Sequence, residues 1–415
     1  MPKYIKINKK ISSFNKKIFV DGDKSLSIRW ALLKYEDVMS TLKCLKKLGV
    51  KIKWKNNYCE INGKGLNSYN YKKNLTLDAG NSGTLGRLIL GLLIHSKKNI
   101  KLIGDKSLSK RDFSRVTKPL KKFGANFYYK KKRGLPVTIL GSKFINPIKY
   151  IENRGSAQCK SSVMFAALNT KGTTFIKAKK SRNHSELLFK HLKIPIKIKK
   201  TKKYDLIKIK GKKEIKPFNY RIPGDISSSA FFMVLTALSD KSKLLIKDVN
   251  INYSRVGVIK ILKKMGVKIL IKNKKNYNGE KIADIYIESS KNLKAINCPV
   301  DLNSSAIDEF LIIFLVAAKA KGISHFKNLS ELNQKESPRL EWGSKILNMM
   351  NIKTKVTSHS IKIFGNPKIE VKNIIQIKNY LKDHRIFMMS TIAALTFGGT
   401  WKIQNPESIK TSFPS

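Results

Sequence analysis

The stretch IKILKKMGVKILI at residues 259–271 joins an amphipathic helix pattern to a strand pattern through a single glycine. A glycine just after the last apolar residue of a helix is a common C-terminal cap, and the β-branched run after it is typical of a strand. The same order appears in KPLKKFGANFYY (118–129) and STLKCLKKLGVKIKW (40–54). Looser copies are ELLFKHLKIPIKI (186–198) and KILNMMNIKTKV (345–356). We therefore expect the chain to repeat a helix followed directly by a strand.

A second pattern, a more apolar helix opened by small polar residues and followed by a strand, alternates with the first. Its copies lie at 81–104, 161–178, 227–249, 308–329 and 385–404. Together the patterns predict an α/β (α+β) fold built from roughly six βαβαββ-type repeats, three to each of two domains. The first repeat is incomplete. The apolar helix that opens with SIRWALL (27–33) is followed at once by KYEDVMSTL, where every other copy has more helix, a turn and a strand.

The length and charge of the chain bound its class. Its 415 residues are too many for one ordinary core, so two domains are expected. Lys and Arg number 85 against 27 Asp and Glu, a net charge of +58 that suggests a nucleic-acid partner. The lysines, however, run through every segment, and aromatic residues are not interleaved with them as in base-stacking surfaces. We expect a solvated lysine surface and no nucleic-acid partner.

The cysteines and apolar runs indicate a cytoplasmic protein. The four cysteines stand far apart, without the paired spacing of a zinc site or a disulfide framework, which fits a reducing compartment. The first twenty residues lack the apolar core of a signal peptide. The apolar runs at 85–94 and 309–318 are too short to span a bilayer, so no membrane partner is expected.

Only eleven of the basic residues are arginine, and six of them stand in short polar stretches. Arginine can grip a carboxylate or phosphate with two parallel hydrogen bonds, which lysine cannot do. Such placement in a lysine-rich chain predicts a site for anionic ligands. The six are Arg29, Arg87, Arg111, Arg182, Arg339 and Arg385.

Two of these stretches precede helices in the first half of the chain. DKSLSIR (23–29) places Lys24, Ser25 and Arg29 at a helix start, where free N–H groups attract anions. For that stretch alone, a capped and solvated helix start is the favoured interpretation. In GNSGTLGR (80–87), Gly80 and Gly83 let the backbone approach a ligand closely. The polar residues between them can bind a ligand or cap the helix. For this second stretch, structural and functional interpretations are evenly matched.

Two further stretches lie near the C-terminus. In KESPR (335–339), Ser337 is expected to cap a helix whose first residue is Pro338. DHR (383–385) places three polar residues at the start of the last apolar helix, where burying them costs free energy unless they are paired. A lone histidine at such a position, however, commonly only caps the helix or packs against it. Asp308 and Glu309 precede another apolar run, where acids also favour the helix dipole. Cations for two anions together with a few acids indicate a transferase acting on phosphorylated substrates.

At this point the chain resembles the 5-enolpyruvylshikimate-3-phosphate (EPSP) synthase family. The matching stretches follow the family's order: DKSLSIR, LDAGNSGTLGR, GDKSLSKR, GSAQCKS, SRNHSE, PGDISSSAFF, DEF, KESPRL, KDHR and PESIKTSFP. The resemblance implies a two-domain, inverted α/β barrel-like enolpyruvyl transferase fold with crossovers near residues 17 and 222. One domain would be 18–221 and the other 1–17 with 222–415, with the active site in the cleft between them. The chain ends at Ser415, where the resemblance leads us to expect a further helix.

The resemblance also implies the reaction. The enolpyruvyl group would move from phosphoenolpyruvate to the 5-hydroxyl of shikimate 3-phosphate, releasing phosphate, by addition and then elimination through a tetrahedral intermediate. These two small molecules would be the substrates of a monomer that needs no metal and no organic cofactor.

Site residues are carried over by the same resemblance. Shikimate 3-phosphate would contact Lys24, Ser25, Arg29, Ser156, Ala157, Gln158, Arg182, Asp308 and Lys335. Phosphoenolpyruvate would contact Lys24, Asn81, Gly83, Arg111, Gln158, Lys335, Arg339, Arg385 and Lys410. Support for that pocket would come from Thr84, Arg87 and Asp383. The catalytic residues would be Lys24, Asp308, Glu336 and His384. Of these, Asp308 would take or orient the 5-hydroxyl proton, Lys24 and Glu336 would transfer protons at the enolpyruvyl carbon, and His384 would orient Glu336.

Three alternatives stay open. UDP-N-acetylglucosamine enolpyruvyl transferase shares the fold and the donor, but that family usually has Asn after the N-terminal Lys and a loop Cys. Here Ser25 follows Lys24, and residues 104–112 contain no Cys. A basic RNA-binding module would show steeply salt-dependent RNA binding. The gap after Leu33 also leaves open an inactive, truncated homologue.

Overall fold

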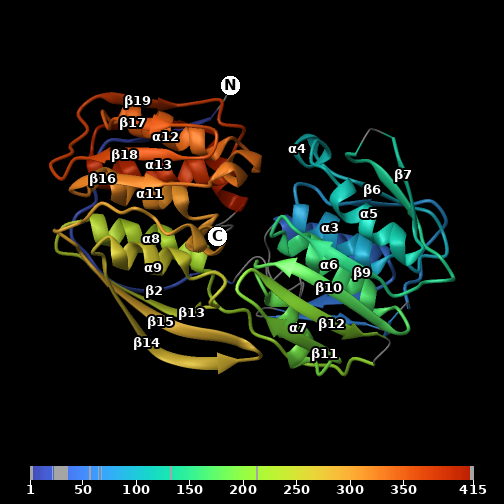
Figure 1. Ribbon diagram of the computed structural model, residues 1–415. Coiled ribbons are helices and arrows are strands. Elements are labelled where there is room, and N and C mark those ends of the chain that lie inside the picture. Colours follow the sequence, from blue (N-terminus) through green and yellow to red (C-terminus); the bar gives the residue numbers. More distant parts are fainter. Residues whose placement is uncertain are drawn as a thin grey trace. The chain divides into compact units, whose positions relative to one another are not determined.

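The computed structural model describes residues 3–20, 22, 36–55, 58–63, 65–66, 68–130, 133–211 and 214–411. The chain forms two compact units (Figure 1). One unit consists of Met1–Asp23 together with Pro223–Ser415, and the other of Lys24–Ile222. The polypeptide therefore leaves the first unit after a short N-terminal segment and returns to it near residue 222.

The unit formed by Lys24–Ile222 contains two βαβαββ modules, each with one four-stranded sheet. In each sheet the first two strands of the module pair in parallel, and the last two strands add to them in antiparallel fashion. The first module consists of β5 (Leu75–Asp78), α3 (Gly83–Leu92), β6 (Ile100–Ile103), α4 (Lys106–Ser109), α5 (Ser114–Phe123), β7 (Asn126–Tyr129) and β8 (Val137–Leu140). The second consists of β9 (Lys149–Glu152), α6 (Ala157–Leu168), β10 (Thr173–Lys179), α7 (His184–His191), β11 (Ile196–Lys200) and β12 (Tyr204–Lys210).

The other unit repeats this topology with strands from both of its segments. β2 in the N-terminal segment pairs in parallel with β13, and β15 and β14 complete that sheet in antiparallel fashion. This module consists of β2 (Asn15–Phe19), α8 (Ile226–Leu238), β13 (Lys243–Asn250), α9 (Gly257–Lys264), β14 (Lys268–Tyr277) and β15 (Glu280–Glu288). The recurrence of one sheet order in three modules confirms the predicted repeat.

The remaining elements form smaller sheets with their own helices. One three-stranded sheet has the order β16-β18-β17, another has the order β1-β20-β19, and β3 and β4 form a hairpin. Their strands are β1 (Tyr4–Ile7), β3 (Lys51–Trp54), β4 (Cys59–Asn62), β16 (Gly322–Phe326), β17 (Thr354–Val356), β18 (Ile361–Gly365), β19 (Ile374–Ile377) and β20 (Thr400–Gln404). The helices are α2 (Glu36–Lys47), α10 (Asn303–Ala306), α11 (Phe310–Lys319), α12 (Arg339–Met349) and α13 (His384–Phe397), with 3₁₀ turns η1 (Val300–Leu302), η2 (Ser330–Gln334) and η3 (Pro406–Thr411).

Local chemistry explains where these helices begin and end. Gly124 ends α5 with φ of 118°, a left-handed conformation that favours glycine, and β7 follows as predicted. At the other end, side-chain oxygens of Ser82, Ser156 and Asp383 accept main-chain N–H groups and cap α3, α6 and α13. The polar residues before the apolar helices therefore build helix starts.

One predicted helix start is wrong. The helix that follows KESPR begins at Arg339, and its cap residue Pro338 makes no side-chain hydrogen bond to it. The Ser337 hydroxyl instead donates to Asp383 Oδ2 over 2.8 Å. A hydrogen bond from a hydroxyl to a carboxylate is charge-assisted, and this contact orients the Ser337 side chain toward Asp383.

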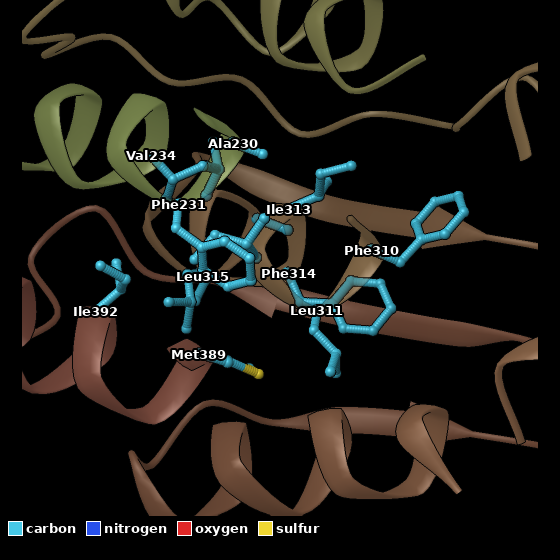
Figure 2. Packing of buried hydrophobic residues seen from close by; sticks show 14 of the residues in the cluster. Ala230, Phe231, Val234, Phe310, Leu311, Ile313, Phe314, Leu315, Met389 and Ile392 are labelled. Atoms are coloured by element: carbon cyan, nitrogen blue, oxygen red, sulfur yellow. The ribbon is translucent and has the colours of Figure 1, made fainter. Parts of the chain in front are cut away.

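Three apolar helices form the centre of the core in the unit that contains both chain ends. Figure 2 shows side chains of α8, α11 and α13 directed toward one another, among them Val234, Phe314 and Met389. All three side chains are fully buried. Because a fully buried side chain of this size contributes about 1.5–3 kcal/mol, this packing fixes the three helices against each other. The polar residues at their N-terminal ends are thereby held in place.

The fold class is thus confirmed as mixed α/β. Of the predicted incomplete first repeat, α2, β3 and β4 are described, while SIRWALL (27–33) lies outside the described residues. Within the described ranges, no helix is both long and apolar enough to cross a bilayer.

Candidate functional site

The start of α3 brings two arginines to one glycine. Ser82 Oγ accepts the N–H of Leu85 at 3.2 Å, which leaves Gly83 as the first residue of the helix. A Cβ atom placed on Gly83 would lie 3.0 Å from Arg111 Nη1 and 3.1 Å from Arg87 Nη1. Both guanidinium groups therefore converge on the space that the missing side chain leaves, and any larger residue would push against them.

Asn81 joins this group from the loop before the helix. Its Nδ2 donates to Asp105 Oδ2 over 2.6 Å, and its Oδ1 lies 3.5 Å from Arg111 Nη2. Asp105 in turn caps α4 by accepting the N–H of Leu108 at 2.6 Å. The exposed Asn81 is thus oriented by the loop that carries Arg111.

Gln158 on α6 is held from α3 by two side chains. Gln158 Nε2 donates to Thr84 Oγ1 over 2.8 Å, and Arg87 Nη1 donates to Gln158 Oε1. The Arg87 guanidinium also lies over the Phe113 ring, 5.6 Å from its centroid. Burial lowers the pKa of Arg87, and the positive charge of Arg111 lowers it further. Arginine stays charged even so, which makes this a half-buried, fixed positive charge.

Ser156 and Arg182 lie at the starts of neighbouring helices, α6 and α7. The Glu152 carboxylate accepts the N–H groups of Arg154, Gly155 and Ser156 at 3.1, 2.7 and 2.9 Å and so fixes the turn before α6. Ser156 then caps α6 through the N–H of Cys159. The half-buried Ala157 and Gln158 follow on the first turn of that helix.

A second group of predicted residues gathers in the other unit around Arg339. This arginine is 2% exposed, and its Nε donates to Asp383 Oδ2 over 2.9 Å. It also forms ion pairs with Glu336 and, at 3.6 Å, with Asp308. Burial alone would lower the pKa of Arg339, but the negative charges of Asp383 and Glu336 outweigh it and raise the pKa above its ordinary value.

Asp308 lies between three cationic side chains. Lys335 Nζ is 3.2 Å from its Oδ1, on the oxygen that also faces Arg339. Arg385 Nη1 donates to the main-chain oxygen of Asp308 over 2.6 Å. The carboxylate is only partly exposed, so it is presented at the edge of a dense group of positive charges.

Arg385 is held in place by Glu309, noted above only for the helix dipole, and by three residues that the sequence did not single out. Glu309 Oε1 is 3.9 Å from Arg385 Nη1 and accepts a hydrogen bond from Ser227 Oγ. Arg255 Nη2 donates to Ser227 Oγ over 2.7 Å and to Asp225 Oδ1 over 2.8 Å. This buried chain of alternating charges links the starts of α8, α11 and α13. The only sequence signal for it is a polar residue before each apolar helix.

The positions of the remaining predicted residues say less about their roles. His384 is the first residue of α13 and is 8% exposed, and Lys410 is an exposed residue of η3. Lys24, Ser25 and Arg29 lie outside the described residues. Within the described ranges, no cluster of His, Cys, Asp and Glu side chains could hold a metal ion.

Each unit therefore carries one compact group of fixed cations. Asn81, Gly83, Thr84, Arg87, Arg111 and Gln158 come together in one unit, and Asp308, Lys335, Glu336, Arg339, Asp383 and Arg385 in the other. Such groups can bind carboxylate or phosphate without reorganising, and the adjacent acids can move a proton.

Comparison with known proteins identifies the family to which this chain belongs. The sequence matches the family described as "EPSP synthase (3-phosphoshikimate 1-carboxyvinyltransferase)" over residues 9–415. The 3-phosphoshikimate 1-carboxyvinyltransferase of Ruthia magnifica subsp. Calyptogena magnifica is 40% identical, covering 95% of this chain and 92% of the relative. The protein of that name from Streptococcus mutans serotype c is 35% identical, covering 99% and 97%.

A solved structure agrees. The EPSP synthase from Acinetobacter baumannii superposes with a TM-score of 0.87 at 34% identity, covering 99% of this chain and 96% of that one. The agreement extends over the modules and helices described above.

Proposed function

The chain belongs to the EPSP synthase family, and on that premise we propose that it is a 3-phosphoshikimate 1-carboxyvinyltransferase of the shikimate pathway. It transfers the enolpyruvyl group of phosphoenolpyruvate to the 5-hydroxyl of shikimate 3-phosphate and releases phosphate. The products serve chorismate and aromatic amino acid biosynthesis. The comparisons favour neither the UDP-N-acetylglucosamine enzyme, nor an RNA-binding module, nor an inactive homologue.

The observation that carries the mechanism is the position of Asp308 between Lys335 and Arg339. A carboxylate in this position can accept or orient the 5-hydroxyl proton of the acceptor. The acceptor oxygen then bonds to C2 of phosphoenolpyruvate while a proton adds to C3, which gives a tetrahedral intermediate. Loss of a C3 proton and departure of phosphate restore the double bond.

We assign the C3 proton transfers to Glu336 and Lys24, with His384 as the residue that orients Glu336. Glu336 lies three residues before Arg339 and forms an ion pair with it. Arg339 also forms an ion pair with Asp308, so one arginine contacts both acids. Fixed cations beside these acids stabilise the negative charge that develops as phosphate leaves. The acids and the cations thus act on one substrate centre.

Binding of two multiply charged anions requires cations held in advance. For phosphoenolpyruvate we assign Lys24, Asn81, Gly83, Arg111, Gln158, Lys335, Arg339, Arg385 and Lys410, with Thr84, Arg87 and Asp383 supporting them. For shikimate 3-phosphate we assign Lys24, Ser25, Arg29, Ser156, Ala157, Gln158, Arg182, Asp308 and Lys335. Holding the cations in place lowers the entropic cost of bringing both anions together.

Neither a metal nor an organic cofactor is required by this mechanism. We further propose that the enzyme acts as a cytoplasmic monomer, without a nucleic-acid or membrane partner. Salt-independent elution at the monomer volume in gel filtration would support that assignment.

A test with matched variants separates this function from the alternatives. Phosphate release from phosphoenolpyruvate should require shikimate 3-phosphate and should not occur with UDP-N-acetylglucosamine as acceptor. Arg385→Lys should lower kcat/KM by about a hundredfold, since lysine cannot replace a two-pronged contact. The same change at the exposed Arg133 should leave kcat/KM nearly unchanged. Equal effects at both positions would contradict the site assignment.

A further inference from the structure

A fully buried lysine connects two helix starts of the proposed acceptor site. Lys160 on α6 is 0% exposed, and its Nζ donates to the main-chain oxygen of Arg182 over 3.0 Å. Its own N–H donates to the main-chain oxygen of Ser156 over 3.1 Å. One residue therefore joins Ser156, before α6, to Arg182, before α7.

The charge of Lys160 is balanced from α7. Its Nζ forms an ion pair of 2.5 Å with Glu186 Oε1, and the Glu186 side chain is 3% exposed. Asp205 on β12 is also buried and interacts electrostatically with both members of the pair. Burial raises the pKa of Asp205, and the positive charge of Lys160 opposes that rise.

A buried ion pair is a weak source of stability. Replacing a buried ion pair by well-packed apolar residues is commonly neutral or stabilising. Stability alone therefore does not explain a lysine with no exposed surface near the start of α6. Its bond to the Arg182 carbonyl supplies the missing reason, because a main-chain oxygen in a loop can be fixed only by a donor.

We propose that Lys160 is a positioning residue for shikimate 3-phosphate, which holds the Arg182 loop at a set distance from Ser156 and Gln158. The inference rests on the proposed function, because it takes Ser156 and Arg182 as contacts of the phosphorylated acceptor. Lys160 itself is buried and touches no substrate. Its effect is on the spacing of residues that do.

Lys160→Met together with Glu186→Met removes the pair without leaving a lone buried charge. Asp205 then loses one attraction and one repulsion, so this double variant should keep a melting temperature close to that of the wild type. Its KM for shikimate 3-phosphate should still rise about tenfold, the effect of losing one hydrogen bond from a charged donor. Its KM for phosphoenolpyruvate should change by less than about twofold, since that substrate is assigned neither Ser156 nor Arg182 and its shared contact Gln158 is held by Thr84 and Arg87.

Two single variants complete the test. Glu186→Gln keeps the Lys160 bond to Arg182, so stability should fall while the KM for shikimate 3-phosphate stays near the wild-type value. Lys319→Met is the matched control, because Lys319 is a half-buried lysine that donates to the main-chain oxygen of Leu238 in the other unit. It should leave both KM values unchanged.

The outcomes are distinguishable. A double variant with a wild-type KM for shikimate 3-phosphate would overturn the proposal, and so would one that fails to fold, since the pair would then serve folding itself. An equal rise of KM in Glu186→Gln would also overturn it. Calorimetric titration of the wild-type chain with shikimate 3-phosphate tests the premise separately, because absence of binding there would refute the proposed function.

Discussion

Arg385 donates from Nη1 to the main-chain oxygen of Asp308 over 2.6 Å, so a proposed donor-binding residue is fixed to the backbone of a proposed catalytic acid. Because the bond uses the backbone oxygen, the Asp308 carboxylate remains directed at Lys335 and Arg339. A substitution of the Asp308 side chain can therefore separate proton transfer from the binding of phosphoenolpyruvate.

Asp308→Asn should lower kcat with little effect on donor binding. The amide keeps the shape and the main-chain contact to Arg385, but it cannot accept a proton. We expect kcat to fall by about 10² to 10³, with the KM for phosphoenolpyruvate within about threefold of wild type. Steady-state phosphate release measures both constants. The exposed Asp240→Asn is the control, and a KM effect without a kcat effect would contradict the assigned role.

Gly83→Ala should impair donor binding by steric pressure on two arginines. The new Cβ would meet Arg111 Nη1 at 3.0 Å and Arg87 Nη1 at 3.1 Å, closer than nearly all such contacts. We expect the KM for phosphoenolpyruvate to rise about tenfold, because an added methyl group in a packed site commonly displaces its neighbours at a cost of about 1–3 kcal/mol. Gly63→Ala, where nothing lies within 4 Å, should have no effect. Identical kinetics in the two variants would rule out the pocket at Gly83.

Glu309→Gln should weaken donor binding although Glu309 is 2% exposed. The change removes the negative charge that faces Arg385 and keeps an oxygen that can accept from Ser227. We expect about a fivefold rise in the KM for phosphoenolpyruvate, as for loss of one contact in a charged network. Glu280→Gln, a buried glutamate that accepts from Asn252, controls for general effects of burial. An unchanged KM in Glu309→Gln would show that Arg385 is positioned without it.

Acid destabilisation should depend on Asp284. Burial alone would raise its pKa, but hydrogen bonds from Lys247, Asn273 and the main chain of Asp248 lower the pKa below its ordinary value. A lowered pKa in the folded state stabilises the protein above the unfolded pKa, and this contribution is lost as pH falls through the folded pKa.

Asp284→Asn should therefore lower the free energy of unfolding at pH 7 by about 1.5–3 kcal/mol, the range for hydrogen bonds to a charged group. The difference between variant and wild type should shrink below about pH 4, where the carboxyl begins to protonate in the unfolded chain while the folded chain still keeps it ionised. Urea unfolding at several pH values measures it. The exposed Glu370→Gln should show no such trend, and a pH-independent difference for Asp284→Asn would contradict the assigned ionisation.

The repeating part of the fold could be predicted because it is local. The amphipathic run, its glycine and the strand that follows lie within about a dozen residues, and Gly124 ends α5 as that order predicts. The start of α12 could not be predicted in the same way. Ser337 is drawn to Asp383, which lies 46 residues away in the sequence.

The candidate site was predictable in its arginines but not in their supports. Arginine stands out against the lysine background, whereas Lys160 does not, although its side chain has no exposed surface. Gln158 and Arg87 are 71 residues apart, and their bond depends on the packing of α3 against α6. From the sequence alone, the acidic residue Glu309 before α11 is explained equally well by a favourable interaction with the helix dipole. Only the structure shows its contacts with Ser227 and Arg385.

The most direct test of the account is the fate of phosphorus when the chain is mixed with both substrates. ³¹P NMR should show the phosphoenolpyruvate signal decline as inorganic phosphate and a new 3-phosphate ester appear in equal amounts, only when shikimate 3-phosphate is present. Folded protein that leaves both substrate signals unchanged would contradict the proposed function. Phosphate release without the new ester would contradict it as well.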